Sequence, residues 1–232
     1  MSKLTEAVHR EFIAGRSPFD WCFLLTGLAI QVLVFLLAPS APIMIVSGIA
    51  GIFSVILCSQ GKISTYLFGF VQVITYLIIC YRQRLYGEVG INIFYFLSMI
   101  YGVFVWMRRY HVDAETGSSE VQTRKLSAIW WISIVAAVLL GSLLTGWFLA
   151  NYTDDSDPYL DAFTTIPAIA GQVLMVFRYR EQWFFWFCID IGCIWLWVRA
   201  GNWSMAALYA FWCANCIYGF LHWTKSAKQQ DI

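Results

Sequence analysis

Eight apolar stretches, each about as long as a helix that crosses a bilayer, constrain this chain more than any other feature. They are residues 21–38, 42–58, 63–81, 89–107, 126–150, 162–177, 183–198 and 203–223. A bilayer core needs roughly 17–25 predominantly apolar residues in a helix. Only one formal charge, that of Asp190, falls inside these stretches. The sequence therefore predicts an all-α membrane protein with eight transmembrane helices.

Composition excludes the soluble class. Hydrophobic residues make up 60% of the 232 residues and charged residues only 12%, about half of what a soluble domain uses to build its surface. A net charge of +1 argues against a nucleic-acid partner, because phosphate recognition needs clustered Lys and Arg. The first apolar stretch is longer than the core of a signal peptide, so we expect it to be a retained helix.

The seven cysteines all lie in apolar stretches and are expected to be small buried hydrophobes. Cys213 and Cys216 form a C-x-x-C without a second ligand pair, so no metal site is predicted. No cofactor is predicted either. The three histidines lie at or beyond the ends of spans, and no P-loop or G-x-S-x-G motif occurs. The sequence therefore favours a protein that is not an enzyme.

Loop charges predict how the bundle sits in the membrane. If the N-terminus is cytoplasmic and all eight stretches span, twelve Lys and Arg residues fall on the cytoplasmic side and three on the other. This is a strong positive-inside bias. The loop that carries Asp154, Asp155, Asp157 and Asp161 has no Lys or Arg and falls outside. We expect a multi-pass membrane protein with both termini cytoplasmic.

Two short words recur in the same order and indicate an internal duplication. Ile49-Ala50-Gly51 returns as 169–171, and Ile100-Tyr101-Gly102 with Trp106 returns as 217–219 with Trp223. The predicted units are an N-terminal segment with one extra helix (1–41), a first three-helix repeat (42–107), a loop, linker helix and acidic external loop (108–161), a second repeat (162–223) and a tail (224–232). One linker helix makes the repeats parallel, an arrangement of 3+1+3 helices, and places a substrate site between them near the midplane. Duplication thus favours a transporter over a membrane enzyme.

Three residues of the seventh stretch form the sharpest candidate site. Trp183, Trp186 and Asp190 are spaced i, i+3 and i+7, which puts them on one face of a helix. Two indoles beside a carboxylate would bind a flat cationic ring, since the indole face attracts cations. A lone carboxylate near mid-bilayer is costly unless it is paired. The alternatives are a helix-packing hydrogen bond for Asp190 and an interface anchor for Trp183.

Polar residues of the other repeat are the expected partners. Subtracting 118 from 190 gives Gln72, which shares a helical face with Thr65, Gly69 and Tyr76. Gln172 lies centrally in the sixth stretch and Asn92 in the outer third of the fourth. Each amide can donate to and accept from a hydroxyl or a carboxamide. Each could instead be a helix-packing contact, but together they favour a cavity.

Several motifs resemble those of the PnuC-type bacterial nicotinamide riboside transporters. They are Gly61-Lys62-Ile63-Ser64-x-Tyr66-x-x-Gly69 with Gln72, Arg178-Tyr179-x-Glu181-x-Trp183-x-x-Trp186, Asp161, Tyr101-Gly102 with Trp106, and Gly219 with Trp223. The resemblance covers roughly residues 42–223. It implies an architecture like that of SWEET sugar transporters and facilitated uptake of nicotinamide riboside (vitamin B3), a precursor of NAD. It further implies a homotrimer and trapping of the substrate by a cytoplasmic nicotinamide riboside kinase.

The exact substrate is open at this stage. Family members often have Asn at the positions of Gln72 and Asp190, and relatives carry thiamine or other vitamins. Nicotinamide riboside and thiamine both have a quaternary ring nitrogen, which an acid suits.

Uniport is the expected mechanism, because the chain has neither nucleotide motifs nor a proton relay. A scaffold or sensor subunit without a cavity is the alternative from another class, and a channel is a third.

Overall fold

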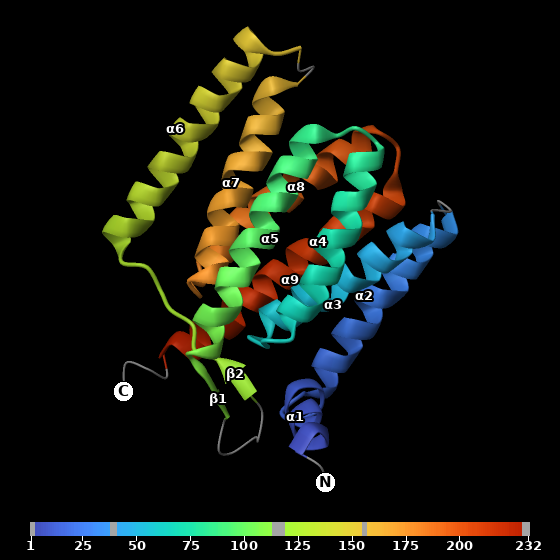
Figure 1. The fold of residues 1–232 in the computed structure, drawn as a ribbon, viewed down its shortest axis with the longest axis vertical. Helices are drawn as coiled ribbons and strands as arrows, with labels where there is room; N and C mark the ends of the chain where they lie inside the picture. Colours follow the sequence, from blue (N-terminus) through green and yellow to red (C-terminus); the bar gives the residue numbers. More distant parts are fainter. Residues whose placement is uncertain (1–2, 38–40, 113–118, 155–156, 229–232) are drawn as a thin grey trace.

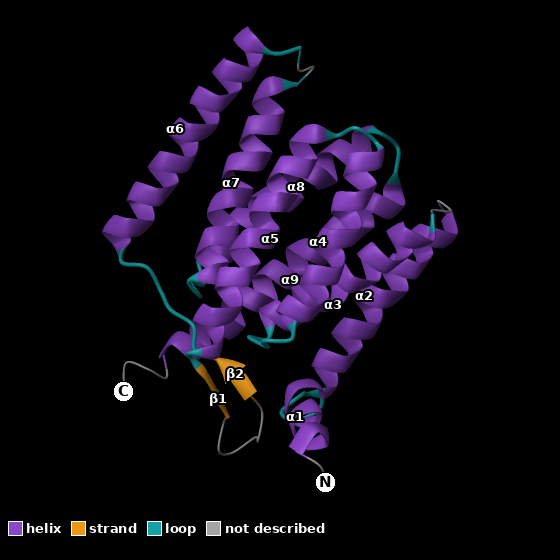
Figure 2. Ribbon diagram, in the orientation of Figure 1, coloured by secondary structure: helices purple, strands orange, loops and turns teal. Residues whose placement is uncertain are grey.

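The computed structural model describes residues 3–37, 41–112, 119–154 and 157–228, which form nine helices and one two-stranded sheet (Figures 1 and 2). The helices are α1 (Lys3–Phe12), α2 (Pro18–Leu37), α3 (Pro42–Ser59), α4 (Thr65–Arg82), α5 (Tyr86–Met107), α6 (Ala128–Tyr152), α7 (Pro158–Val176), α8 (Gln182–Arg199) and α9 (Trp203–Lys228), and the strands are β1 (Tyr110–Val112) and β2 (Ser119–Val121). The middle of the loop after β1, Asp155 in the acidic loop and the tail after residue 228 lie outside the described residues.

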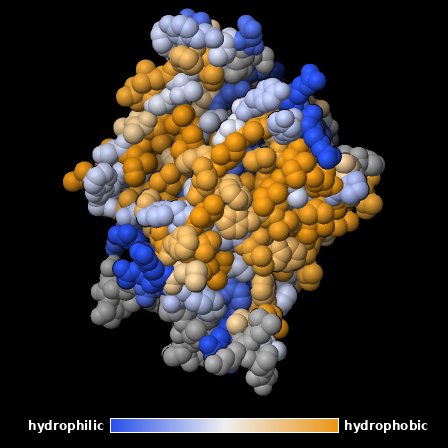
Figure 3. Space-filling view, viewed as in Figure 1, coloured by the Kyte–Doolittle hydropathy of each residue, from blue (hydrophilic) through white to orange (hydrophobic). Residues whose placement is uncertain are grey.

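Seven of the described helices are long and apolar enough to cross a membrane, which confirms an all-helical membrane protein. This is one fewer than the eight expected. The helix that falls short is α8, because Gln182, Asp190 and Arg199 and a series of indoles lower its mean hydropathy. Figure 3 shows apolar residues over the flanks of the bundle and hydrophilic ones gathered toward its ends.

Two helix triplets, α3–α4–α5 and α7–α8–α9, form the centre of the molecule. Within each triplet the middle helix packs against the other two, and the triplets meet crosswise, α5 against α7 and α3 against α9. Helix α6 packs against α7, and α2 covers α3 and α9. In Figure 1, α6 accordingly lies at one edge of the bundle and α2 at the other.

The turns within the two triplets match at a constant offset of 117 residues. Gly61, after α3, has φ 66°, and Arg178, after α7, has φ 65°. Arg84, after α4, has φ 60°, and Gly201, after α8, has φ 70°. These left-handed residues end their helices in the manner of a C′ residue, a position that normally favours glycine. Each triplet therefore reverses direction through the same pair of turns.

Two indole hydrogen bonds join the triplets reciprocally at the same offset. Trp106 Nε1 donates to the carbonyl of Met175 at 3.2 Å, and Trp223 Nε1 donates to the carbonyl of Cys58 at 3.0 Å. The offset corrects the arithmetic based on 118, because 117 relates Asp190 to Val73 rather than to Gln72. The two polar side chains are thus neighbours of equivalent positions and not equivalents.

The sequence did not predict α1 or the β1–β2 hairpin, which lie together at one end of the molecule. We call this the hairpin end (Figure 1). The Glu11 carboxylate of α1 accepts hydrogen bonds from the backbone N–H of Ser64 and from the hydroxyls of Tyr110 and Ser119. Burial raises the pKa of the Tyr110 phenol, and its hydrogen bond to Glu11 adds to the effect. A buried acid therefore fixes α1 to both the hairpin and the start of α4.

A short segment, residues 119–124, crosses the hairpin end and hydrogen-bonds to both triplets. We call it the strap. The backbone N–H of Val121 donates to the carbonyl of Gly61, and that of Arg124 donates to Arg178. The Thr123 hydroxyl donates to the carbonyl of Trp223 at 2.6 Å. The strap therefore holds the two triplets together at this end.

The strap also covers buried cationic side chains. Lys62 Nζ donates to the carbonyl of Ser119 at 3.0 Å, and burial lowers the pKa of this ammonium, although Glu120 and Glu11 act in the opposite direction. Burial, and then the charges of Arg124 and Arg109, lower the pKa of Arg178 to about 10. Both side chains therefore depend on the strap for hydrogen-bond acceptors.

Candidate functional site

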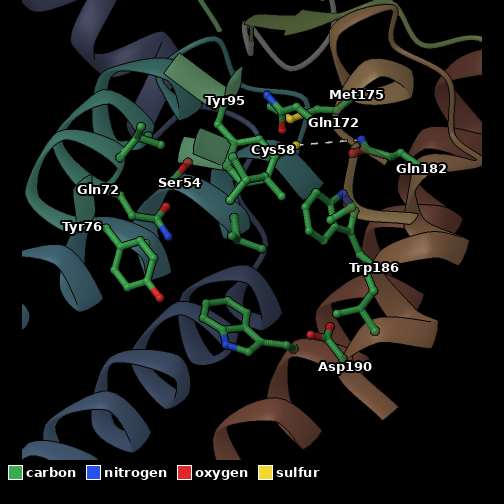
Figure 4. A pocket seen from close by; sticks show the side chains of 18 of the residues that line it. Ser54, Cys58, Gln72, Tyr76, Tyr95, Gln172, Met175, Gln182, Trp186 and Asp190 are labelled. Atoms are coloured by element: carbon green, nitrogen blue, oxygen red, sulfur yellow. Dashed lines mark hydrogen bonds between the residues drawn. The ribbon is translucent and has the colours of Figure 1, made fainter. Parts of the chain in front are cut away.

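A cavity of about 470 Å³ lies between the two triplets and is lined by all six of their helices. This volume is in the range of small-molecule sites. All eight residues proposed from the sequence line it: Thr65, Gln72, Tyr76, Asn92, Gln172, Trp183, Trp186 and Asp190. Figure 4 shows Gln72 and Tyr76 on one side, Trp186 and Asp190 on the other, and Gln172 and Tyr95 at the top of the view. The geometry therefore brings together residues that lie up to 125 positions apart.

Asp190 is a buried acid in the cavity wall, and its side chain is only 9% exposed. Among the described residues, the Cys216 thiol donates a hydrogen bond to this carboxylate, at 3.5 Å. A thiol is a weak donor, so this contact compensates little of the cost of burying a charge. Asp190 thus retains most of its capacity to bind a cationic or hydrogen-bonding ligand.

The two tryptophans of α8 have different surroundings. Trp186 packs over Gly171, where an added Cβ would lie 3.1 Å from its indole nitrogen, and its ring faces the cavity near Asp190 (Figure 4). Trp183 is 3% exposed and lies edge-on to Trp223, with ring centroids 5.7 Å apart. Its Nε1 has no hydrogen-bond partner among the residues that the structure describes. Of these two indoles, Trp186 is therefore the one available to stack on a ligand, and Trp183 closes one end of the cavity.

The three amides proposed from the sequence are held to different degrees. Gln172 Nε2 donates to the Ser98 hydroxyl at 2.9 Å, which leaves its oxygen to face the cavity or a neighbour. Asn92 Nδ2 donates to the carbonyl of Glu88, one turn earlier, at 2.8 Å. The Gln72 side chain lies against Gly51, where an added Cβ would be 3.1 Å from its nitrogen. Gln72 is thus the amide that the structure ties down least.

Thr65 and Tyr76 mark the two ends of the cavity. Thr65 is 1% exposed and exchanges hydrogen bonds with Ser54, because its hydroxyl donates to the Ser54 carbonyl and its own carbonyl accepts from the Ser54 hydroxyl. Tyr76 lies at the other end and is 41% exposed. The cavity is therefore closed toward the hairpin end and accessible from the opposite end.

Four aromatic rings close the hairpin end of the cavity. Tyr66, Trp106, Trp183 and Trp223 are each at most 3% exposed. Edge-to-face contacts link Tyr66 to Trp106 and Trp106 to Trp223, at centroid distances of 5.2 and 5.8 Å. We call these rings the aromatic floor. They lie directly between the cavity and the strap, so two layers separate the site from this end.

The sequence analysis missed several residues that line the cavity, namely Ser54, Cys58, Glu88, Tyr95, Gln182, Tyr209 and Trp212. Glu88 was missed because the fourth apolar stretch was expected to begin at Val89, whereas α5 begins at Tyr86. The helical spacing from Glu88 to Asn92 and Tyr95 could have revealed it. As a result, the described helices carry a second carboxylate into the cavity.

Substituting Gly219 by Ala is expected to destabilise the protein by about 1–3 kcal/mol, because overpacking a tight contact forces neighbours to move. A Cβ at Gly219 would lie 2.5 Å from Cε2 of Trp183, whose ring is already wedged against Trp223. The measurement is the midpoint of thermal unfolding in detergent. Gly192→Ala is the matched control, since nothing lies within 4 Å of its added Cβ. Equal midpoints for both variants would refute the close contact.

Known proteins of one kind match both the sequence and the fold. The family model described as nicotinamide mononucleotide transporter matches residues 41–225. The nicotinamide riboside transporter PnuC of Neisseria mucosa is 34% identical over 230 residues, covering 96% of this chain and 87% of that protein. The transporter of the same name from Haemophilus influenzae is 31% identical over 229 residues, covering 98% and 99%. The crystal structure of the vitamin B3 transporter PnuC has a TM-score of 0.80 and 32% identity over 95% of this chain and 96% of that one.

Proposed function

Since this chain belongs to the PnuC family of membrane transporters, we propose that it carries nicotinamide riboside across the membrane. The observation that supports this substrate most is the cavity between the triplets. It offers indole rings, a buried carboxylate and four amides. Nicotinamide riboside has a flat pyridinium ring, a carboxamide and ribose hydroxyls, so each of its groups has a matching partner.

The charge of the cavity favours the riboside over its phosphorylated form. Its lining contains two carboxylates, Asp190 and Glu88, and no Lys, Arg or His among the described residues. Phosphate recognition in proteins relies on Arg, Lys or a helix N-terminus. Without such a group, two carboxylates repel a phosphate and attract a pyridinium. The cavity therefore suits the nucleoside and disfavours the mononucleotide.

In the proposed architecture, α3–α5 and α7–α9 are two parallel three-helix repeats, α6 is the linker, α2 is the extra helix, and α8 crosses the membrane as the eighth span. The equivalent turns and the reciprocal indole hydrogen bonds support this 3+1+3 arrangement. The hairpin end would face the cytoplasm, because the helix ends and loops there carry most of the Lys and Arg residues. The homotrimer and the coupling to a cytoplasmic kinase rest on the family resemblance alone.

Purified protein in liposomes should take up labelled nicotinamide riboside saturably, with unlabelled riboside competing and the mononucleotide and thiamine competing little. The cavity has no cationic partner for the phosphate of the mononucleotide among the described residues, and thiamine lacks the carboxamide and the ribose hydroxyls that the amides would bind. Uptake should end when the inner and outer concentrations are equal, as expected for uniport. The measurement is filtration of vesicles over time, with protein-free liposomes as the control.

Three results would contradict these proposals. Uptake no faster than into protein-free liposomes would refute the transport function. Competition by thiamine as strong as that by the riboside would refute the assignment of substrate. Accumulation above the outer concentration, dependent on a proton or sodium gradient, would refute uniport. The non-transporting scaffold is not favoured, because it predicts no cavity between the triplets.

A further inference from the structure

Glu88 is the second acid of the cavity, and beyond its share in the negative charge of the lining it has been given no role of its own. It lies in the first turn of α5, at the end of the molecule opposite the hairpin. Together with Asn92, Tyr95 and Met99 it forms one stripe, spaced by four, three and four residues, and all four side chains line the cavity. The stripe therefore leads from the mouth of the cavity toward its centre.

The exposure of the lining residues shows that this mouth is the accessible end. Glu88 is exposed, and Tyr76, which lies nearby, is 41% exposed. At the hairpin end the lining residues Cys58, Thr65 and Gln182 are 5%, 1% and 1% exposed. The aromatic floor and the strap lie beyond them. A substrate entering this conformation of the protein consequently passes Glu88 before it reaches Asp190.

The surroundings of Glu88 suit an organic cation. Tyr76 of α4 and Tyr95 of α5 both lie within the electrostatic reach of its carboxylate. Asp161 adds a further negative charge nearby. The described residues give the Glu88 carboxylate neither a hydrogen bond nor an ion pair, although its backbone carbonyl accepts from Asn92. A carboxylate beside two phenol rings has the composition of a cation-binding site.

We propose that Glu88, with Tyr76 and Tyr95, forms an entry site for organic cations that is separate from the site at Asp190 and Trp186. This inference rests on the proposed transport of a cationic nucleoside. An exposed carboxylate is screened by water and salt, so it adds little to tight binding. Its field nevertheless raises the local concentration of cations at the mouth and speeds their entry. Glu88 is therefore a residue that selects substrates by charge through the rate of loading.

The test compares initial uptake rates of Glu88→Gln and the unchanged protein in liposomes at low substrate. At about 10 mM salt, we expect the variant to take up nicotinamide riboside about three- to tenfold more slowly. The difference should shrink at about 500 mM salt, where the Debye length falls to a few ångströms. KM should rise while kcat stays unchanged. Uptake of the reduced dihydropyridine riboside, which has the same shape and no charge, should be equal for both proteins.

Two further variants separate charge from structure. Glu88→Asp keeps the carboxylate and should retain both the rate and its dependence on salt. Asp154→Asn removes an exposed acid that does not line the cavity and should match the unchanged protein. The proposal is overturned if Glu88→Gln equals the unchanged protein at low salt, if it slows the neutral analogue equally, or if Glu88→Asp is impaired to the same extent. Absence of uptake by the unchanged protein would instead reject the proposed function.

Discussion

Replacing Asp190 by Asn is expected to weaken the binding of nicotinamide riboside roughly ten- to a hundredfold, or about 1.5–3 kcal/mol. Asp190 is 9% exposed, and among the described residues its carboxylate receives only the weak hydrogen bond from Cys216, so a bound pyridinium would be its main source of neutralisation. Asn keeps the shape of the side chain and removes its charge. The measurement is calorimetric titration of the purified variant with the charged riboside and with its neutral dihydropyridine form.

The neutral ligand is the internal control for this substitution. Its affinity should change little, because it gains nothing from the negative charge. If Asp190 only bridges helices, the variant should instead unfold at a lower temperature and keep the ratio of the two affinities. An unchanged affinity for the charged riboside in a folded Asn variant would remove Asp190 from the site.

Truncating Trp186 to Ala is expected to weaken binding by about 1–3 kcal/mol, roughly five- to more than a hundredfold. The indole presents an aromatic face to the cavity near Asp190, and Ala removes this stacking surface. Trp186→Phe keeps a ring and should recover part of the affinity. Titration calorimetry on both variants gives the comparison, and equal losses for Ala and Phe would argue against stacking.

Trp183 should behave differently, although its spacing from Trp186 and Asp190 predicts one shared stacking face. It belongs to the aromatic floor, packed against Trp223 and Gly219. Removing such a buried ring leaves a hole in the packing, so the main loss is one of stability. This distinction separates a wall that meets the ligand from a floor that closes the cavity.

The residues of the cavity could be predicted because burying a polar side chain in an apolar helix costs free energy unless it faces another polar group or a ligand. Gln72, Gln172, Asn92 and Asp190 stand out on this ground alone, and the structure brings all four to one cavity. Their roles in binding stay predictions. What the sequence could not reveal is that Gln172 donates to Ser98, because these two side chains become neighbours only after α5 and α7 pack together.

The features missed are those that depend on tertiary contacts or on a helix boundary. Helix α1 and the hairpin are short and polar, and they are held by Glu11 and by the strap rather than by an apolar pattern. Glu88 was lost because hydropathy places the start of a span where charges end, whereas α5 begins at Tyr86. The correspondence between Gln72 and Asp190 was wrong by one residue, an error that short repeated words cannot exclude.

The hydrogen bonds of the strap have a consequence for the rate of transport. Main-chain hydrogen bonds attach the strap to the turn after α3 and the turn after α7, and the Thr123 hydroxyl attaches it to the carbonyl of Trp223 in α9, so rotating side chains alone cannot release it. Each of these hydrogen bonds contributes only about 0.5–1.5 kcal/mol to stability. Because all of them hold the same short segment, we expect them to break together. Substrate entry at the opposite end of the cavity, beside Glu88, breaks none of these hydrogen bonds. We therefore expect the two half-cycles of transport to differ in rate. Substrate entry beside Glu88 should be fast, whereas separation of the strap from the two triplets should be slow and strongly temperature-dependent. This slow step would set the turnover rate of the transporter.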